Sequence, residues 1–526
     1  MEKRIIVAVA LSFIVFFLYN QVINHFFPPA TESNPNNTVA PSSSIDIEDN
    51  ETSTLEDTEV TTQDYFLKIS DQGSITIADF LAYKNPDDKG PFPFIKSPGS
   101  NHGIAAHRVW VNGALFKAKP QTTINANTIT TKATSDTLDV TKVIQLNNQK
   151  FASNLSIQIV NKTSAPIQIE LEVMAGAGVV SQNTIDQQYI ETNWIYPTTI
   201  QHIKTFGKKK SKVSSEPISA ASIKSRHFST ILKPLTNIAY TGISAGYDNK
   251  TMISSIKTNP LTLSPSEILT ESMLLYIGPN DVPNLTPYGL ERVVNFGKLD
   301  FICKLLIGGM QLAHSVVKNY GLAIILLTLT VNIILMPLTK VSFMSMKRMQ
   351  TIQPEINKAR EKYKDNPKKL NEETLELYKK HRVNPMGGCL PMLAQMPIFI
   401  ALYVALSKST ELLGAKFLWV DNLAYPDKLP LPFTLPLIGD NIHILPLLMV
   451  GGMVIQQKIA SSNMQGLNPE IEKQQKVMAT FMPIFFGFIF YPMPSGLVLY
   501  WLTNTVFTSV YQQILRKAPA SLPATT

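Results

Sequence analysis

Five apolar segments in the carboxy-terminal half of the chain constrain its fold more than any other feature. They cover residues 320–338, 390–407, 442–457, 477–493 and 496–513. Their interiors carry almost no charge, and Lys and Arg are confined to the intervening loops. The alternative, buried core helices of a soluble domain, does not require this pattern. At about 1.5 Å per residue the shorter segments span about 25 Å, slightly less than the ~30 Å hydrocarbon core of a bilayer. The series therefore predicts membrane-spanning helices with local thinning of the bilayer around them.

A sixth apolar segment lies near the amino end. Residues 5–18 follow Lys3 and Arg4, as in a secretory signal peptide, but no small-residue cleavage site follows them. We expect a transmembrane anchor over residues 1–27 with its amino end inside, and a removed signal peptide is the alternative. Residues 28–64 are rich in Ser, Thr, Asn, Pro and acids and contain no Lys or Arg, which predicts a disordered acidic linker.

The range 65–285 alternates between apolar and polar residues with a period of two. Leu155, Ile157 and Ile159 form one such run, and residues 167–173 form another. The turn-like stretch 161–166 between these runs predicts a β-hairpin. One apolar and one polar face per strand favour an antiparallel, all-β sandwich domain over the whole range.

Composition and motifs exclude several classes of protein. Charged residues make up 16% of the chain, against about 25% in ordinary soluble domains. The two cysteines, Cys303 and Cys389, exclude a disulfide scaffold and a thiolate zinc site. We find no phosphate loop, no nucleophile motif, no paired carboxylates in the apolar segments and no ligand spacing among the histidines. We therefore expect neither an enzyme nor a cofactor or metal.

Basic residues set the predicted topology through the positive-inside rule. Lys347 and Arg348, Lys458, and Arg516 follow apolar segments on the side that also holds the amino end, whereas Lys408 is an exception. This arrangement predicts that both chain ends are cytoplasmic and that the β domain lies outside. Residues 288–312 mix apolar and charged residues and predict an amphipathic helix in the outer interface.

A polar, basic stretch over residues 341–383, here called the basic hairpin, follows the second apolar segment. Asn366-Pro367 divides it into two helical arms. The apolar residues predicted to join the arms are Met349, Ile352, Ile356, Leu370, Leu375, Leu377 and Tyr378. The basic residues predicted to dock partners are Lys358, Arg360, Lys362, Lys364, Lys368 and Lys369. Two interpretations stay open: a solvated hairpin that enforces topology, or a docking arm for RNA or lipid headgroups.

Polar residues recur at helical spacing inside three of the apolar segments. They are Thr328 and Asn332; Gln395, with Phe399 and Tyr403 on its face; and Tyr500, Asn504, Thr508 and Tyr511. One interpretation is hydrogen bonding between helices, at about 0.6 kcal/mol per bond. The other is a hydrated cavity within the membrane, which we favour because the polar faces occur in three segments and lie toward the cytoplasmic side.

Four short motifs, in this order, carry a resemblance to a known family. They are Pro337-Leu338-Thr339-Lys340, Asn384-Pro385-Met386-Gly387-Gly388, Gln395-Met396-Pro397-Ile398-Phe399 and Pro494-Ser495-Gly496-Leu497-Val498-Leu499-Tyr500. Over residues 288–515 the chain resembles the YidC membrane-protein insertase family. The anchor, linker and β domain resemble the long Gram-negative form of that family in layout.

The resemblance implies a multi-domain membrane protein of the bacterial inner membrane. It implies a six-span helical bundle with a five-helix core over residues 286–517, a short tail over 518–526 and a periplasmic β domain. A hydrophilic groove, open to the cytoplasm and the lipid, would pass nascent membrane proteins into the bilayer, with a chaperone role and no nucleotide. Implied partners are the Sec translocon, the ribosome and membrane lipids, and not DNA. The residues assigned to the groove are Thr328, Asn332, Gln395, Met396, Tyr500, Trp501 and Asn504.

One position departs from the family pattern. The family usually has Arg where this chain has Asn332, and Asn retains hydrogen-bonding groups but not the charge. We therefore expect the groove to act through hydration more than through attraction of acidic clients. A membrane-anchored assembly scaffold with a periplasmic binding domain, and a small-solute channel, are the alternative functions.

Overall fold

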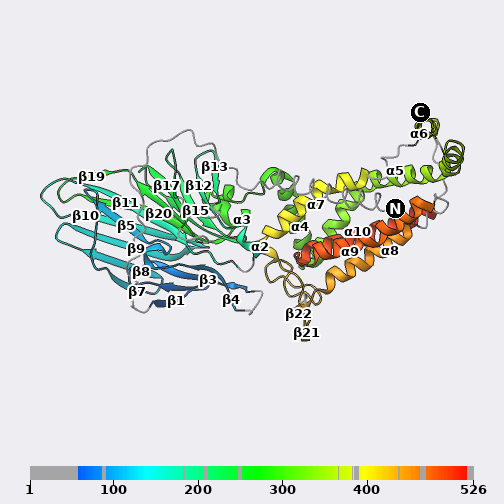
Figure 1. Ribbon diagram of the computed structural model, residues 1–526. Helices are drawn as coiled ribbons and strands as arrows, with labels where there is room; N and C mark the ends of the chain where they lie inside the picture. Colours follow the sequence, from blue (N-terminus) through cyan, green and yellow to red (C-terminus); the bar gives the residue numbers. More distant parts are fainter. Residues whose placement is uncertain are drawn as a thin grey trace. The chain divides into compact units, whose positions relative to one another are not determined.

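The computed structural model describes most of the chain, in two compact units (Figure 1). The described residues are 57–85, 90–181, 184–204, 211–246, 251–364, 366–381, 383, 390–435, 439–461 and 469–517. The β unit is Met1–Lys298 and the helical unit is Leu299–Thr526, and each is described by itself. The predicted anchor (1–27), most of the predicted linker, the tail (518–526) and residues 384–389 lie outside the described residues.

The β unit contains three antiparallel sheets within the described part of the chain. The first has the order β1 (Thr58–Thr61), β2 (Tyr65–Ile69), β3 (Ile75–Lys84), β4 (Pro91–Lys96). The second runs β13 (Ile200–Ile203), β12 (Glu191–Ile195), β15 (Ala220–Lys224), β16 (Phe228–Pro234), β20 (Ile268–Pro279), β10 (Ala152–Asn161), β9 (Leu138–Gln149), β8 (Thr128–Thr134), β7 (Gln121–Asn125). The third runs β14 (Ser211–Val213), β17 (Tyr240–Gly246), β18 (Met252–Thr258), β11 (Ile167–Ala177), β5 (His107–Val111), β6 (Ala114–Leu115), with β19 (Leu261–Leu263) also paired to β11.

The second and third sheets pack on each other, as the period-two pattern predicted. Strands β11 and β18 of one sheet contact β15 of the other. Leu155, Ile157 and Ile159 of β10 are buried, while their neighbours along the strand are more exposed. The sandwich therefore buries the apolar side of each strand.

The predicted hairpin at residues 161–166 is wrong. Strand β10 pairs with β9 and β20, whereas β11 pairs with β5, β18 and β19, so the two runs belong to different sheets. The side-chain amide of Asn161 donates to the carbonyl oxygens of Ala165, Leu263 and Ser264, at 3.0, 3.1 and 3.0 Å. These bonds hold the stretch as a connection between the two layers, and a turn-like sequence does not distinguish this from a hairpin.

The linker predicted over residues 28–64 extends too far. Strand β1, Thr58–Thr61, lies inside that range and pairs along its length with β2. Its sequence is polar because most of the strand is exposed, so its composition matches that of a solvated linker. An ion pair of 3.0 Å between Glu59 and Lys68 crosses the two strands. The β-rich region therefore begins before residue 65.

Lys142, on β9, is a fully buried cation in the β unit. Its ammonium donates to the carbonyl oxygens of Gln72 and Ala105, at 3.1 and 3.0 Å. Burial lowers the pKa of Lys142 from 10.5 to about 7. Burial, reinforced by the charge of Lys142, also lowers the pKa of the His107 imidazole to about 3. His107 is therefore neutral at pH 7 and above.

These shifts predict how the stability of the β unit varies with pH. Between pH 7 and 10.5 the unfolded chain holds a proton on Lys142 that the folded chain has released, so the free energy of unfolding rises with pH, by up to about 1.4 kcal/mol per unit. Lys142→Met is expected to remove this slope. Urea unfolding of the full-length protein in detergent, followed by tryptophan fluorescence at pH 7, 8 and 9, measures it. An unchanged slope in the variant would contradict the assignment.

The amphipathic helix predicted over residues 288–312 begins later than predicted. Helix α4 covers Asp300–Val317, and before it the chain forms short 3₁₀ turns, η2 (Thr286–Tyr288), η3 (Glu291–Val293) and η4 (Gly297–Leu299). Leu290, Val293 and Val294 are buried within the β unit. The apolar residues that indicated a helical face therefore anchor this segment to the β unit.

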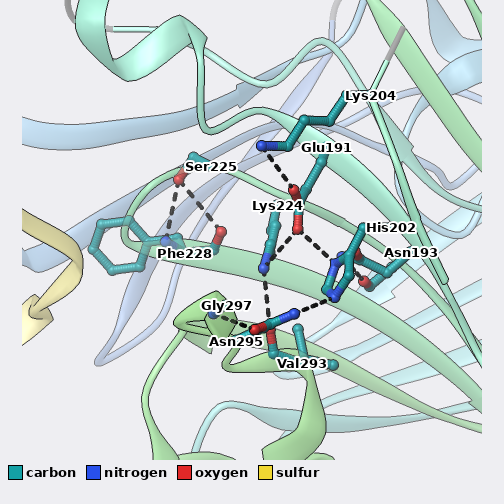
Figure 2. Close-up of polar contacts among 11 residues, drawn as sticks. Glu191, Asn193, His202, Lys204, Lys224, Ser225, Phe228, Val293, Asn295 and Gly297 are labelled. Carbon is teal, nitrogen blue, oxygen red and sulfur yellow. Dashed lines mark hydrogen bonds and ion pairs between the residues drawn. The ribbon is translucent and has the colours of Figure 1, made fainter. Parts of the chain in front are cut away.

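Polar contacts fasten the same segment to strands β12, β13 and β15 (Figure 2). Lys224 donates to the carbonyl oxygen of Val293 at 3.0 Å. The side-chain amide of Asn295 lies 2.6 Å from Nε2 of His202, while its carbonyl oxygen accepts from the Gly297 amide. The Asn295 amide group therefore donates to His202, whose Nε2 accepts the bond.

Glu191 is the anion at the centre of this cluster. It lies 2.8 Å from Lys224 and 2.9 Å from Nδ1 of His202, with Lys204 at 3.6 Å. Burial alone would raise the pKa of the Glu191 carboxyl, but these partners outweigh it and hold the pKa well below its usual range. Removal of the carboxylate would leave Lys224 buried without its anion.

We expect Glu191→Gln to lower the free energy of unfolding of the β unit by about 3–5 kcal/mol, the cost of leaving a buried charge unpaired. The matched control is Glu59→Gln, which breaks an exposed pair and should cost at most about 1 kcal/mol. Denaturant unfolding of full-length protein at pH 7 gives both values. Equal losses in the free energy of unfolding for the two substitutions would show that the buried cluster stabilises the β unit no more than the exposed pair does.

The helical unit contains a helix at each of the five predicted apolar ranges. Its described helices are α4 (Asp300–Val317), α5 (Tyr320–Lys362), α6 (Pro367–Lys380), α7 (Leu390–Lys408), α8 (Ile444–Ser461), α9 (Pro469–Phe490) and α10 (Ser495–Lys517), with a two-stranded hairpin β21 (Leu429–Leu435) and β22 (Gly439–Ile442) before α8. Helix α5 continues without a break from the second apolar segment into the basic hairpin, through Pro337 and Pro354.

Two stretches of the described chain are long and apolar enough to cross a membrane, Gly297–Val317 and Tyr320–Lys362. Shorter apolar helices cover Leu393–Lys408, Ile444–Ile459 and Thr480–Phe490. The predicted bundle of six spans is therefore not confirmed by helix length and composition, and stays a prediction. Within the unit, α10 packs against α5, α7 and α8, and α9 packs against α8 (Figure 1).

The basic hairpin forms two helical arms, divided at Asn366, which caps α6. A small apolar cluster joins the arms through Ile352, Ile356 and Val383, with Met349, Leu377 and Tyr378 packed against it. Leu370 and Leu375, which the sequence pattern places in this contact, are not part of the cluster, and Leu375 is 56% exposed. Helical spacing explains this, because Leu375 lies about 200° around the helix from Leu377.

Candidate functional site: the polar faces of the helical unit

Three helices carry all seven residues assigned to the groove, and these helices contact one another pairwise. Helix α5 carries Thr328 and Asn332, helix α7 carries Gln395 and Met396, and helix α10 carries Tyr500, Trp501 and Asn504. The fold therefore brings together residues that are up to 176 positions apart in the sequence, from Thr328 to Asn504.

On helix α5 two polar residues are buried beside exposed apolar ones, although Ile324 and Leu327 are also buried. Thr328 is fully buried and Asn332 is 8% exposed, whereas Ile333 and Ile334 are exposed. The Thr328 hydroxyl donates to the carbonyl oxygen of Ile324 at 2.6 Å, and the Asn332 amide donates to that of Thr328 at 2.9 Å. Both donors are thus satisfied within their own helix. Neither makes the hydrogen bond between helices that is the alternative to a cavity.

On helix α10 polar residues are likewise buried beside exposed apolar ones, although Leu497, Val498 and Leu499 are buried too. Tyr500, Thr505 and Ser509 are buried, while Val506 and Val510 on the adjoining face are exposed. Apolar side chains outside and polar ones toward the bundle interior are the distribution expected of a helix in lipid. Thr505 and Ser509 were not singled out from the sequence, although their spacing of four residues was a usable signal.

Gln395 and Tyr500 connect two of the three helices. The Gln395 amide donates to the Tyr500 hydroxyl, which joins α7 to α10 at the level of the polar faces. Gln395 and Asn504 are partly exposed. Their amide groups are therefore not sealed inside the bundle.

Trp501 does not belong to the polar face with Tyr500. Its ring packs against Phe399 of α7 at 5.0 Å between centroids, and against Phe486 and Phe490 of α9 at 5.5 and 5.1 Å. Consecutive residues on a helix point about 100° apart, so the two side chains serve different contacts. The role of Trp501 in the groove stays a prediction, and the aromatic cluster is a feature that sequence analysis missed.

The cluster predicts a contrast between neighbouring substitutions. Trp501→Ala should lower the free energy of unfolding of the helical unit by about 3–5 kcal/mol, because it empties a space between three helices. Tyr500→Phe keeps the ring and loses one hydrogen bond, at about 1 kcal/mol. Thermal unfolding of the protein in detergent, followed by helical circular dichroism, separates them, and a larger loss for Tyr500→Phe would contradict the packing described.

The basic docking residues lie where the two arms of the basic hairpin meet. Lys358, Arg360 and Lys362 are in the last turns of α5, Lys364 follows it, and Lys368 and Lys369 are in the first turn of α6. A cation at a helix amino end is unfavourable for the helix itself, but it adds to the positive field there. The docking role of these residues stays a prediction.

Comparisons with known proteins agree with the motifs. A family model described as 60Kd inner membrane protein matches residues 312–521, and one described as YidC periplasmic domain matches residues 57–308. The membrane protein insertase YidC of Geobacter sulfurreducens is 33% identical over 397 residues, which are 73% of this chain and 70% of that protein. The membrane protein insertase YidC of Francisella tularensis subsp. novicida is 31% identical over 472 residues, covering 85% of this chain and 81% of its own.

Solved structures are similar at a lower level. An active YidC insertase crystal structure, with its first transmembrane domain resolved, has a TM-score of 0.36 at 17% identity and covers 86% of this chain and 93% of its own. A putative aldose 1-epimerase from Escherichia coli has a TM-score of 0.30 at 9% identity and covers 42% of this chain. Neither similarity is high enough to carry an argument here.

The two matched regions together define a bacterial inner membrane protein with a periplasmic β-rich domain. The chain belongs to the YidC membrane protein insertase family. The predicted resemblance is thus confirmed. The relatives are named as insertases and not as enzymes.

Proposed function

We propose that the chain inserts nascent membrane proteins into the inner membrane through a hydrophilic groove between α5, α7 and α10, open to the cytoplasm. The observation that carries the proposal is the burial of polar residues beside exposed apolar ones on α5 and α10, where Thr328, Asn332 and Tyr500 are buried and Ile333 and Val506 are exposed. This distribution supports a bundle whose polar groups turn inward at membrane depth.

Physical chemistry explains why such a groove would help a client. The hydrophilic tail of a client faces a steep barrier in hydrocarbon, at about 2.5–3.5 kcal/mol for each charged residue at the bilayer centre on insertion scales. A water-filled notch that reaches partway across the membrane shortens this barrier. Burial of the client's apolar segment in lipid then supplies the driving force, at about 25 cal/mol per Å².

The predicted partners fit the charge of the basic hairpin. Its cations would attract the ribosomal RNA that accompanies a nascent chain, or anionic lipid headgroups on the cytoplasmic face. The chain would act alone or with the Sec translocon, and would hold clients as a chaperone while they fold.

Asn332 offers a test of hydration against specific charge. Its amide donates to the carbonyl of Thr328 in the same helix, so Asn332→Ala removes no bond to another helix. We expect this variant to support growth of a strain depleted of its own insertase, within about twofold of the parent chain. Total loss of complementation at normal protein level would contradict a groove that acts mainly through hydration.

Photocrosslinking to ribosome-bound nascent chains tests the proposed path. A photoreactive residue at Gln395 or Asn504 should crosslink to a client stalled at mid-insertion. The matched control is Val510, an exposed residue on the same helix as Asn504, at which crosslinking should be several-fold weaker. An assembly scaffold, the alternative function, would give no crosslink at either groove position. A small-solute channel would instead conduct ions in planar bilayers.

A further inference from the structure

The loop between α7 and α8 ties together the starts of three helices. Its residues 416–427 bond to residues that begin α5, α8 and α10. The bonds are Asn319 Nδ2 to Lys416 O at 3.1 Å, Leu445 N to Asp427 Oδ2 at 2.9 Å and Ser495 N to Tyr425 O at 2.9 Å. All three helices therefore begin at the same end of the unit, next to this loop.

A tight two-residue turn projects from the loop. Phe417 and Val420 exchange both backbone hydrogen bonds, at 2.9 Å each, which leaves Leu418 and Trp419 at the tip. Leu418 has a φ of 53°, in the left-handed region that favours Gly, Asn or Asp in such turns. Leu418 is therefore strained at this position, where Gly, Asn or Asp would suit the turn better.

The side chains at the tip are exposed although they are apolar. Leu418 is 76% exposed and Trp419 is 37% exposed. The indole N–H of Trp419 donates to the buried carboxylate of Asp427 at 3.1 Å, so the ring is oriented while part of its surface stays uncovered. Strain at Leu418 together with exposure indicates that the side chain is used for contact with something outside the fold.

The tip is held rigidly against the start of α5. The ring of Phe417 lies over Gly321, where an added Cβ would come within 2.2 Å of it. An ion pair of 3.0 Å between the exposed Lys416 and Asp421 flanks the turn. The tip thus has apolar side chains at its end and a charged pair at its base, and it packs against the start of α5.

We propose that Leu418 and Trp419 insert into the outer leaflet of the bilayer and hold this end of the bundle at a fixed depth. Trp and Leu at a helix boundary suit the interface between headgroups and acyl chains, because an apolar body enters the lipid and a polar group stays at the boundary. The flanking pair Lys416 and Asp421 would remain among the headgroups. The chemistry recognised is the upper acyl region of a lipid, and the proposal concerns anchoring, beyond the insertase function and independent of the groove.

Spin-label depth measurements test this in the full-length protein. Leu418→Cys is made in a background of Cys303→Ser and Cys389→Ser, labelled with a nitroxide and reconstituted in phosphatidylglycerol–phosphatidylethanolamine vesicles. The matched control is Lys416→Cys at the charged base of the same turn. The label at position 418 should collide with oxygen several-fold more than with a water-soluble nickel chelate, and the label at position 416 should show the reverse.

Two outcomes overturn the proposal. Nickel accessibility at position 418 equal to that at 416 would place the tip in water. Low accessibility to both reagents, or dipolar broadening between labels, would mean that a second copy of the chain covers the tip.

An unlabelled measurement guards against a distorted variant. Lipids brominated near the headgroup should quench the fluorescence of the parent chain, and Trp419→Phe should abolish about the share of quenching due to that residue. Equal quenching of parent and variant would also reject the anchor.

Discussion

Satisfaction of polar groups in a medium without water is the constraint on which the helical unit depends. A donor left unpaired in hydrocarbon costs several kcal/mol, so Thr328 and Asn332 on α5, and Ser509 on α10, donate to carbonyls one turn earlier in their own helices. Because these bonds are internal, Thr328, Asn332 and Ser509 do not join their helices to one another. Packing between helices is left to the aromatic cluster around Trp501 and to the contact between Gln395 and Tyr500. The donors of Thr328, Asn332 and Ser509 are therefore satisfied without water.

The β unit holds the segment of the chain that leads into α4. Leu290 and Val293 are buried in it, Lys224 and His202 bond to Val293 and Asn295 of the same segment, and Glu191 pairs with both of these basic residues. The segment before α4 is therefore part of the β unit and not a free tether. The loop between α7 and α8 does the comparable work in the helical unit, since Asp427 and Tyr425 bond to the first residues of α8 and α10. In each unit, polar contacts thus hold a segment that leads into a helix.

Sequence patterns predicted the features that depend on local periodicity. The period of two gave the strands around Leu155, and apolar runs gave the helices that carry Thr328, Gln395 and Tyr500. Patterns failed where a distant partner decides the structure. The stretch after Asn161 connects two sheets and makes no hairpin, because its strands find partners far along the chain. The apolar residues at 290–294 matched a helical face, but they are buried in the β unit. The sequence patterns did not predict the aromatic partners of Trp501 on α9 or the strained turn at Leu418, because neither follows from local periodicity.

The central claim is that water reaches the polar faces of α5 and α10 from the cytoplasm while the neighbouring faces stay in lipid. The direct measurement is the rate of thiol modification by a maleimide, in a background without Cys303 and Cys389, of single cysteines at positions 332 and 504 and of controls at 333 and 506. Maleimides react with the ionised thiolate, so a thiol in lipid reacts slowly. In inverted membrane vesicles the account predicts modification at 332 and 504 at least tenfold faster than at 333 and 506. Rates at 332 and 504 as slow as those of the controls would contradict it.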